Sequence, residues 1–221
     1  MRRVTMLTPA GLHKISGTAA YPAAAGLRLC LRSVTAQAHA RLDARRGALD
    51  LTSLPDYRRF LEGSAAALLP LEAALAAARV AEIFPDWELR SRQAAILEDL
   101  ARIGGHLEPL PAPGPLDFGG VLGTMYVLEA SRLDARVLLN AVKRSTDAQV
   151  LHATAFLRHG ADHQFWSSFL MILESHADAD HEAGAIDGAM QAFAMFERAA
   201  AWAHQSQPGA DGGVPAPPPC R

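Results

Sequence analysis

The spacing of apolar residues is the feature that most constrains how this chain can fold. Apolar residues recur every three to four positions along most of the sequence, and no segment alternates apolar and polar residues as a half-buried strand does. Half of the 221 residues are hydrophobic, so a sizeable core can form. A chain of this length buries about 70% of its unfolded surface. We therefore predict an all-α fold, organised as a single multi-helix bundle.

Capping residues divide the sequence into segments of helical length. Thr52 or Ser53 can cap a helix that has Pro55 in its first turn, and Gly47 and Gly104 stand where C-terminal cap glycines belong. The expected helices cover 27–46, 55–75, 87–103, 117–143, 147–158, 163–177 and 180–205.

The two ends differ in composition from the helical middle. Residues 1–25 are a predicted N-terminal extension, with a candidate internal start at Met6, and 207–221 are a Gly- and Pro-rich tail predicted to be disordered. The stretch 107–114 holds three prolines and is predicted to be an internal loop. It is not a domain boundary, because neither side has enough helices to close a core. One helical domain is therefore expected over 26–206.

Charge and cysteine content exclude several classes of protein. The formal net charge is −2 and the basic residues are scattered, so no nucleic-acid surface is expected. No apolar run approaches the roughly 18 residues of a membrane span, and the polar residues after Arg2 and Arg3 argue against a signal peptide. The two cysteines, Cys30 and Cys220, lie in an apolar helix and in the tail, so we expect no disulfide. These features favour a cytoplasmic protein without a membrane or nucleic-acid partner.

A histidine followed by a carboxylate one helical turn later is the most specific local pattern. His39 and Asp43 are four residues apart, and Thr35 and Arg32 precede the histidine on the same helix face. A helical histidine that binds iron needs a hydrogen-bond partner for its second ring nitrogen, which Asp43 can supply. Arg32 lies about 10 Å along the axis, within reach of an anionic group on the same ligand. The spacing alone fits a surface ion pair equally, so both interpretations stay open.

Small residues line one side of the predicted helix over 117–143. Glycine inside a helix costs up to roughly 1 kcal/mol relative to alanine, and this cost is offset where another helix or a flat ligand approaches the backbone. On the sequence alone, packing between helices is favoured over a ligand. The small residues are Gly119, Gly120, Gly123, Ala130, Ser131 and Ala135.

The other histidines give weaker signals. His159 and His163 are four residues apart, but Gly160 between them indicates a junction between helices, and zinc needs at least one further ligand. His176 and His181 fall in a polar stretch that is typical of a solvated turn. No Glu-x-x-His motif, nucleotide-binding loop or hydrolase elbow occurs, which argues against a ferritin-like di-iron bundle and against those enzyme classes.

Two segments of the chain resemble the bacterial heme oxygenases. Residues 31–43 read LRSVTAQAHARLD, which is similar to the start of these proteins, where a Thr precedes the iron-binding histidine by four residues and an acidic residue follows it by four. Residues 123–138 read GTMYVLEASRLDARVL, which is similar to the distal helix of the family, Tyr-Val-Leu-Glu-Gly-Ser-x-Leu-Gly-Gly. Weaker similarities extend in the same order over most of the chain. The resemblance implies a heme oxygenase-like fold with heme as both substrate and cofactor.

The resemblance also implies roles for individual residues. The expected ligand of the heme iron is His39, with Asp43 as its acidic partner and Arg32 facing the heme propionates. The residues expected to contact heme are Arg32, Thr35, Asp43, Gly123 and Tyr126. The expected catalytic positions on the distal helix are Ala130, Ser131 and Asp134.

The family's activity depends on an open distal site, and this chain departs from the family there. Heme oxygenases cleave heme to biliverdin, CO and Fe²⁺ with O2 and an external electron donor, a ferredoxin or a flavoprotein reductase. Glycines of the distal helix let backbone and ordered water approach the oxygen, but two of them are Ala130 and Asp134 here. A buried, unpaired carboxylate costs several kcal/mol or becomes protonated. We therefore expect Asp134 to pair with Arg132 or Arg136, to hold water, or to bind a differently placed ligand.

Three functions remain open on the sequence. His39 with Asp43 favours a heme oxygenase or a non-catalytic relative that binds heme or another tetrapyrrole. Ala130 with Asp134 favours the non-catalytic relative over the enzyme. An interaction module that binds no heme is the third alternative, and the retained histidine and its carboxylate argue against it.

Overall fold

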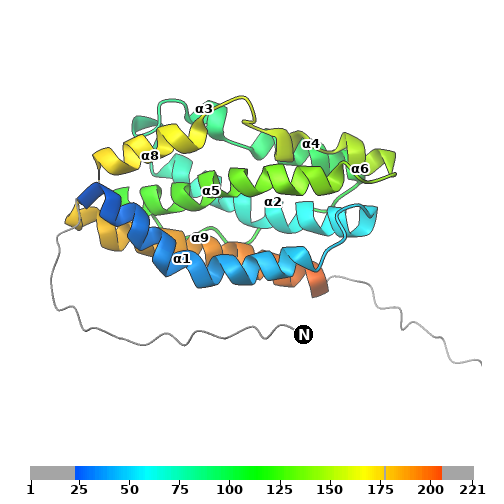
Figure 1. The fold of residues 1–221 in the computed structure, drawn as a ribbon, viewed down its shortest axis with the longest axis horizontal. Coiled ribbons are helices and arrows are strands. Elements are labelled where there is room, and N and C mark those ends of the chain that lie inside the picture. Colours follow the sequence, from blue (N-terminus) through cyan, green and yellow to red (C-terminus); the bar gives the residue numbers. More distant parts are fainter. Residues whose placement is uncertain (1–22, 177, 206–221) are drawn as a thin grey trace, which may run out of the picture.

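The computed structural model describes residues 23–176 and 178–205, and these form helices joined by loops, with no strand among them (Figure 1). The all-α prediction is confirmed. The elements in chain order are α1 (Ala23–Gly47), α2 (Leu54–Ala77), the short 3-10 helix η1 (Val80–Glu82), α3 (Trp87–Arg90), α4 (Gln93–Ile103), α5 (Phe118–Val142), α6 (Ala148–His152), α7 (Ala155–Arg158), α8 (Phe165–Ser175) and α9 (Ala179–Gln205).

The predicted extension and tail lie almost wholly outside the described residues. The first described helix, α1, begins at Ala23, three residues before the predicted domain start, and α9 ends at Gln205. Between these limits one continuous hydrophobic core joins residues from α1 to α9. The predicted tail over 207–221 and the position of Met6 are not among the described residues.

Most predicted capping signals are confirmed. Ser53 caps α2 and its hydroxyl accepts a hydrogen bond from Asp56 N. Asp117, predicted only as the approximate start of its helix, caps α5 in the same way, through Gly120 N at 2.6 Å. Gly104 ends α4 in the left-handed conformation, with φ of 61°. The expectation for Gly47 was wrong, because this residue is the last of α1 and does not adopt a positive φ.

Two segments predicted as single helices are each divided, and a buried carboxylate divides each of them. Helix 87–103 breaks where Glu72 of α2 accepts hydrogen bonds from Arg92 N, at 2.8 Å, and from Ser91 Oγ, at 2.6 Å. Helix 147–158 breaks where Asp99 of α4 accepts from the N–H groups that open α7, at 2.8 and 2.9 Å. Each carboxylate satisfies backbone donors at a new helix start, and this tertiary contact overrides the local helical pattern.

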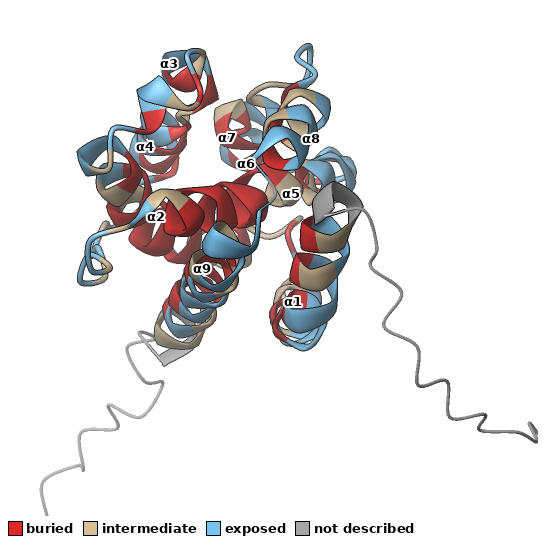
Figure 2. Cartoon of the chain, turned by 90° about the vertical axis from the view of Figure 1, so that its left-hand side faces the viewer, coloured by how far each residue is buried: buried red, intermediate tan, exposed pale blue. Residues whose placement is uncertain are grey.

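Helices α2, α5 and α9 form the centre of the bundle, and buried residues cover most of α2 (Figure 2). Helix α1 packs on α9 and α8, while α4 and α6 pack on α2, and α7 and α8 pack on α5 (Figure 1). The core places α1 and α5 on either side of one seam, and the predicted site residues lie along it. This arrangement positions the site.

Helix α2 corrects one expectation from the sequence. Among the described residues it is the one helix with enough length and apolar character to cross a membrane. The expectation that no apolar run approaches that length was therefore wrong. In its 18-residue apolar window 67% of the residues are buried inside the fold, which is the behaviour of a core helix.

Glycines let α5 and α9 approach each other closely. A Cβ atom on Gly123 would lie 1.9 Å from Ala185 O, and a Cβ atom on Gly188 would lie 2.5 Å from Gly120 O. Both distances are far below van der Waals contact, so each position requires glycine. For this half of α5, the helix-packing interpretation of the small residues is confirmed.

Candidate functional site

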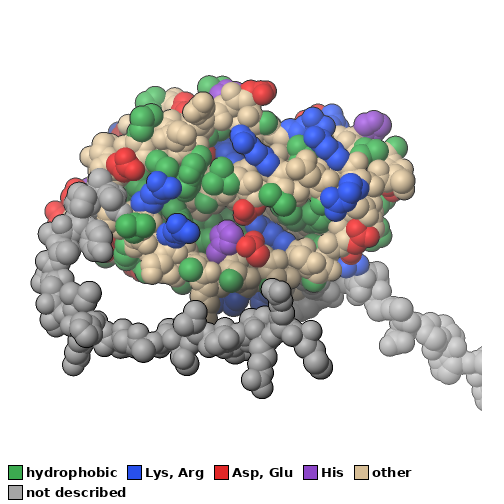
Figure 3. All heavy atoms as spheres, in the orientation of Figure 1, with side chains coloured by type: hydrophobic (Ala, Val, Ile, Leu, Met, Phe, Trp, Pro, Cys, Tyr) green, Lys and Arg blue, Asp and Glu red, His purple; other side chains and the backbone are tan. Residues whose placement is uncertain are grey.

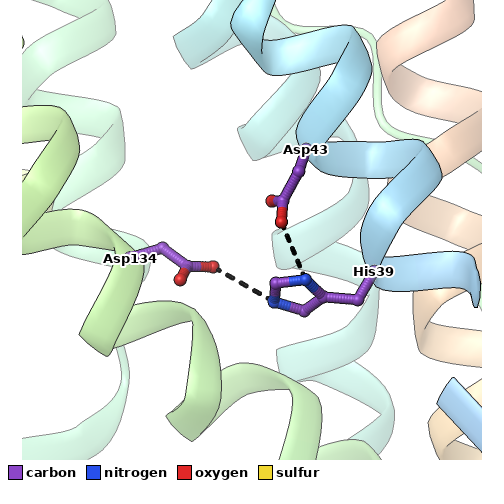
Figure 4. Close-up of side chains that lie close together, drawn as sticks. All are labelled: His39, Asp43 and Asp134. Atoms are coloured by element: carbon purple, nitrogen blue, oxygen red, sulfur yellow. Dashed lines mark ion pairs between the residues drawn. The ribbon is translucent and has the colours of Figure 1, made fainter. Parts of the chain in front are cut away.

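The imidazole of His39 lies between two carboxylates from different helices (Figure 4). Its Nδ1 atom is 2.8 Å from Oδ2 of Asp43, one turn later on α1, and its Nε2 atom is 3.7 Å from Oδ2 of Asp134 on α5. The side chain is 42% exposed and the ring meets Phe193 of α9 edge-on, with the centroids 6.0 Å apart. The predicted contact between His39 and Asp43 is present, and Asp134 joins it from across the seam.

Arg46 is a cation close to both carboxylates of this cluster. Its Nη1 atom is 3.5 Å from Oδ2 of Asp134 and 4.0 Å from Oδ1 of Asp43. Burial raises the pKa of Asp134, and the charges of Arg46 and His39 oppose that rise. Burial also lowers the pKa of the Arg46 guanidinium, against the two aspartates. Sequence reasoning missed Arg46, although it stands seven residues after His39 and therefore on the same helix face.

The prediction that Asp134 pairs with Arg132 of its own helix was wrong. The guanidinium of Arg132 donates to Glu129 Oε2 at 2.9 Å and to the carbonyl oxygen of Arg90. Glu129 in turn lies 3.3 Å from Arg90 Nη1. Arg132 is thus part of a separate buried ion network behind α5, and the described ion-pair partners of Asp134 come from α1.

A second group of predicted residues lies further along the same seam. Tyr126 of α5 is buried, and so is Thr35 of α1, whose hydroxyl donates to Leu31 O at 2.7 Å. Burial raises the pKa of Tyr126, while Thr35 and the charges of Arg28 and Arg32 lower it. Sequence reasoning missed Arg28, which stands 11 residues before His39, about three helical turns away on the same face.

The remaining predicted positions on α5 have other surroundings. Gly123 lies against the backbone of α9. The Ser131 hydroxyl donates to Leu128 O at 2.7 Å and accepts from Arg92 Nη1 at 3.0 Å. Ala130 is half-buried. Of the residues predicted on α5, the structure therefore brings Tyr126 and Asp134 into direct contact with α1.

The seam combines apolar surface with cations. Exposed large hydrophobic side chains on these two helices are Leu29 and Val34 of α1, and Leu133 and Val137 of α5. Figure 3 shows hydrophobic side chains at the surface over the region of α1, α5 and α8, with Lys and Arg side chains around them. A cavity of about 410 Å³ lies at the C-terminal end of α1, with Asp43, Arg46 and Asp134 in its wall, and His39 does not line it. Its size is within the range of small-molecule sites.

The ligand atoms of His39, Asp43 and Asp134 all lie within 4.8 Å of one another, a spacing that suits a metal ion. The Arg46 guanidinium, however, already contributes positive charge to both carboxylates. A divalent cation would have to be accommodated next to that charge. A metal bound at Nε2, with Asp43 holding the other nitrogen, would require the carboxylate of Asp134 to move away from that edge.

The histidine pair outside the seam stands between α7 and α8, as predicted. His159 Nδ1 is 3.1 Å from Arg132 Nη1, and because arginine only donates, this nitrogen accepts. Burial, together with the charges of Arg132 and Arg92, lowers the pKa of His159 to about 4. His163 stacks on Phe165, with the ring centroids 4.6 Å apart.

Comparison with known proteins gives a consistent result. No family model matches the chain. A heme oxygenase from Xanthomonas campestris pv. campestris (strain 8004) is 31% identical over 113 residues, which span 50% of this chain and 67% of that protein. The NO- and CO-bound heme oxygenase from Neisseria meningitidis has the same fold, with a TM-score of 0.70 and 22% identity over 84% of this chain and 94% of that chain. With sequence similarity over two thirds of one relative and the shared all-α fold, the chain belongs to the heme oxygenase family.

Proposed function

We propose that the chain binds heme in the seam between α1 and α5, with His39 as the axial ligand, and cleaves it to biliverdin, CO and Fe²⁺. The observation that carries the proposal is the contact of His39 Nδ1 with Oδ2 of Asp43, 2.8 Å long. With iron bound, a proton on Nδ1 would face this carboxylate and the lone pair on Nε2 would bind the metal. Nε2 also points across the seam toward α5.

The cations of α1 suit the acidic edge of heme. The charges of Arg28 and Arg32 both lower the pKa of Tyr126, and the three residues belong to the two helices of the seam. A guanidinium that binds a carboxylate forms charge-assisted hydrogen bonds worth about 1.5–3 kcal/mol. These residues would hold the propionates and fix the orientation of the ring.

On the distal side, this chain's own residues would exclude solvent and orient water. Heme supplies the iron at which O2 is activated, and the external donor, a ferredoxin or a flavoprotein reductase, supplies electrons. The small side chain of Ala130 keeps α5 close to the seam. The Ser131 hydroxyl is fixed by Leu128 O and Arg92. Asp134 must leave the position that it holds at Nε2, and it would then be an acceptor for distal water.

The proposal includes a cytoplasmic protein that acts on heme without a nucleic-acid or membrane partner. The scattered charge of the chain and the burial of α2 inside the fold support this.

A non-catalytic heme- or tetrapyrrole-binding relative is the second candidate. The position of Asp134 favours it, because the carboxylate stands 3.7 Å from Nε2 and is also paired with Arg46. A charge held there would obstruct the distal site that oxygenase chemistry requires.

Titration with hemin tests the ligand assignment. His39→Ala should abolish the histidine-ligated Soret spectrum, and Asp43→Ala should weaken heme binding on the order of 10-fold, as expected for a partner of a metal-binding histidine. His152→Ala, at an exposed histidine of α6, is the matched control and should bind as the parent does. An unchanged spectrum in His39→Ala would show that iron binds elsewhere.

Product analysis separates the enzyme from the non-catalytic relative. The parent and the variant with Ala130→Gly and Asp134→Gly are loaded with heme and reduced with ascorbate or a ferredoxin system. Biliverdin and CO from the parent would exclude the non-catalytic relative. Heme binding without products in the parent, together with turnover in the double variant, would establish it. The two glycines should cost the helix about 1–2 kcal/mol.

A further inference from the structure

The carboxylate of Asp134 occupies the edge of His39 at which iron would bind. Oδ2 of Asp134 is 3.7 Å from Nε2 (Figure 4). A metal–histidine bond is about 2.0–2.1 Å long, and a porphyrin plane beyond the metal needs several more ångströms along the same line. The carboxylate and the heme therefore exclude each other at this edge of the ring.

Arg46 is a second ion-pair partner for the carboxylate of Asp134. The same oxygen of Asp134 that faces His39 is 3.5 Å from Arg46 Nη1, and the Arg46 side chain is only 16% exposed. A partly buried guanidinium retains its attraction for a carboxylate, because water screens it little. The Asp134 carboxylate can therefore move away from His39 and still be paired with Arg46. Its departure from Nε2 does not leave an unpaired charge inside the protein.

We propose that Asp134 is an internal competitor for the axial position of His39, which closes the heme-free site and turns to Arg46 when heme enters. The inference rests on the proposed function, because it takes His39 as the ligand of the iron. A ligand that binds only the open form has its affinity reduced by the fraction of chains that are open. Asp134 would therefore set how readily this chain takes up heme.

The two aspartates around one histidine should then act in opposite directions. Asp43 contacts Nδ1 and supports the ligand, whereas Asp134 faces Nε2 and competes with the iron. Removing the first should weaken heme binding and removing the second should strengthen it. A general effect of negative charge on an anionic ligand would give both changes the same sign.

Stopped-flow mixing of the full, heme-free chain with ferrous carbonmonoxy heme measures the competition. Asp134→Ala should raise the association rate and lower the dissociation constant about 10-fold, if roughly nine in ten heme-free chains are closed. Asp43→Ala should weaken binding. Asp187→Ala, at an exposed carboxylate of α9, makes the same change in net charge away from the seam and should match the parent. Asp134→Asn removes the charge but keeps an amide that can still contact Nε2, so it should raise the association rate less than Asp134→Ala does.

A double-variant cycle tests the role of Arg46. Arg46→Met leaves Asp134 with His39 alone, so heme association should slow, whereas the same change in an Asp134→Ala background should have no further effect. Association in Asp134→Ala at the rate of Asp187→Ala would contradict the proposed competition. The proposed function fails by a different measurement, namely a parent-like spectrum in His39→Ala. That result would contradict both the proposed function and the competition by Asp134. If His39→Ala does lose the spectrum but Asp134→Ala leaves the rates unchanged, only the competition by Asp134 is contradicted.

Discussion

The two halves of α5 use small residues for different purposes. Residues 119–129 are all buried, and Gly119 and Gly123 there let the backbone of α9 approach. From residue 130 onward, only Ala135 and Val142 are buried, and the polar side chain of Asp134 reaches α1. The small residues of α5 therefore serve helix packing in the first half, whereas in the second half they accompany an accessible polar surface.

This difference shows where a ligand can act on the helix. The first half leaves no accessible surface for a ligand, because its residues are buried and α9 packs against its glycines. The second half borders a cavity of about 410 Å³ and carries exposed hydrophobic side chains. Stability should therefore be sensitive to substitutions in the first half, and ligand binding to substitutions in the second.

The largest effect is expected from Gly123→Ala. Its methyl group would lie 1.9 Å from Ala185 O, so α5 and α9 must separate. We expect a loss of about 3 kcal/mol or more in the free energy of unfolding, since overpacking outweighs the roughly 1 kcal/mol gain in helix propensity. Urea denaturation measures the loss. Gly26→Ala, a helical glycine with open space around it, is the control and should not destabilise. Equal stability in both variants would contradict the comparison.

Glu129→Gln tests the junction between the two halves and should have the next largest effect. Glu129 is buried and its carboxylate faces both Arg90, at 3.3 Å, and Arg132, at 2.9 Å. Removing the charge while keeping the shape should cost about 2–3 kcal/mol, less than a fully broken buried pair because Arg90 keeps Asp86. Thermal unfolding followed by circular dichroism provides the measurement. A loss below about 1 kcal/mol would mean that the network contributes little to stability.

The smallest effect concerns His159, which contacts Arg132 in the second half of α5. Its pKa is lowered to about 4, so between pH 6.5 and 4 the unfolded chain binds a proton that the folded chain does not. Stability should therefore fall as the pH falls through this window. His159→Gln removes this contribution, so its stability should decline less between pH 7 and pH 5 than that of the parent. Urea denaturation at the two pH values checks this, with His152→Gln as the exposed control. A parallel decline in parent and variant would exclude His159 as a source of acid sensitivity.

Much of the fold was predictable because its signals are local. Ser53 and Asp117 cap helices in which the cap and its donor are three residues apart, and such contacts form wherever the chain turns into a helix. The breaks at 91–92 and 153–154 were not predictable in this way. Each depends on a carboxylate, Glu72 or Asp99, that lies close in the fold but at least 19 residues away in the sequence.

The candidate site divides along the same line. The contact of His39 with Asp43 follows from a spacing of four residues in one helix. The ion-pair partners of Asp134 were sought on its own helix, and the structure supplies them from α1 instead. Arg46 stands seven residues after His39, two helical turns away, and Arg28 stands 11 residues before it, about three turns away. Both would have been found by following the His39 face of the helix that far.

The sequence by itself determined the helical class, the order of the helices, the pairing of His39 with Asp43 and the resemblance to one family. The helical class, the helix order and the His39–Asp43 pairing follow from periodicity and short spacing, which a single helix already satisfies, whereas the resemblance rests on the residues at 31–43 and 123–138. Only the tertiary structure decided that Gly123 packs against the backbone of α9, and that Asp134 reaches across the seam to His39 and Arg46. Contacts between helices depend on which faces the core brings together, and that choice is made by the packing of the whole bundle rather than by any one segment.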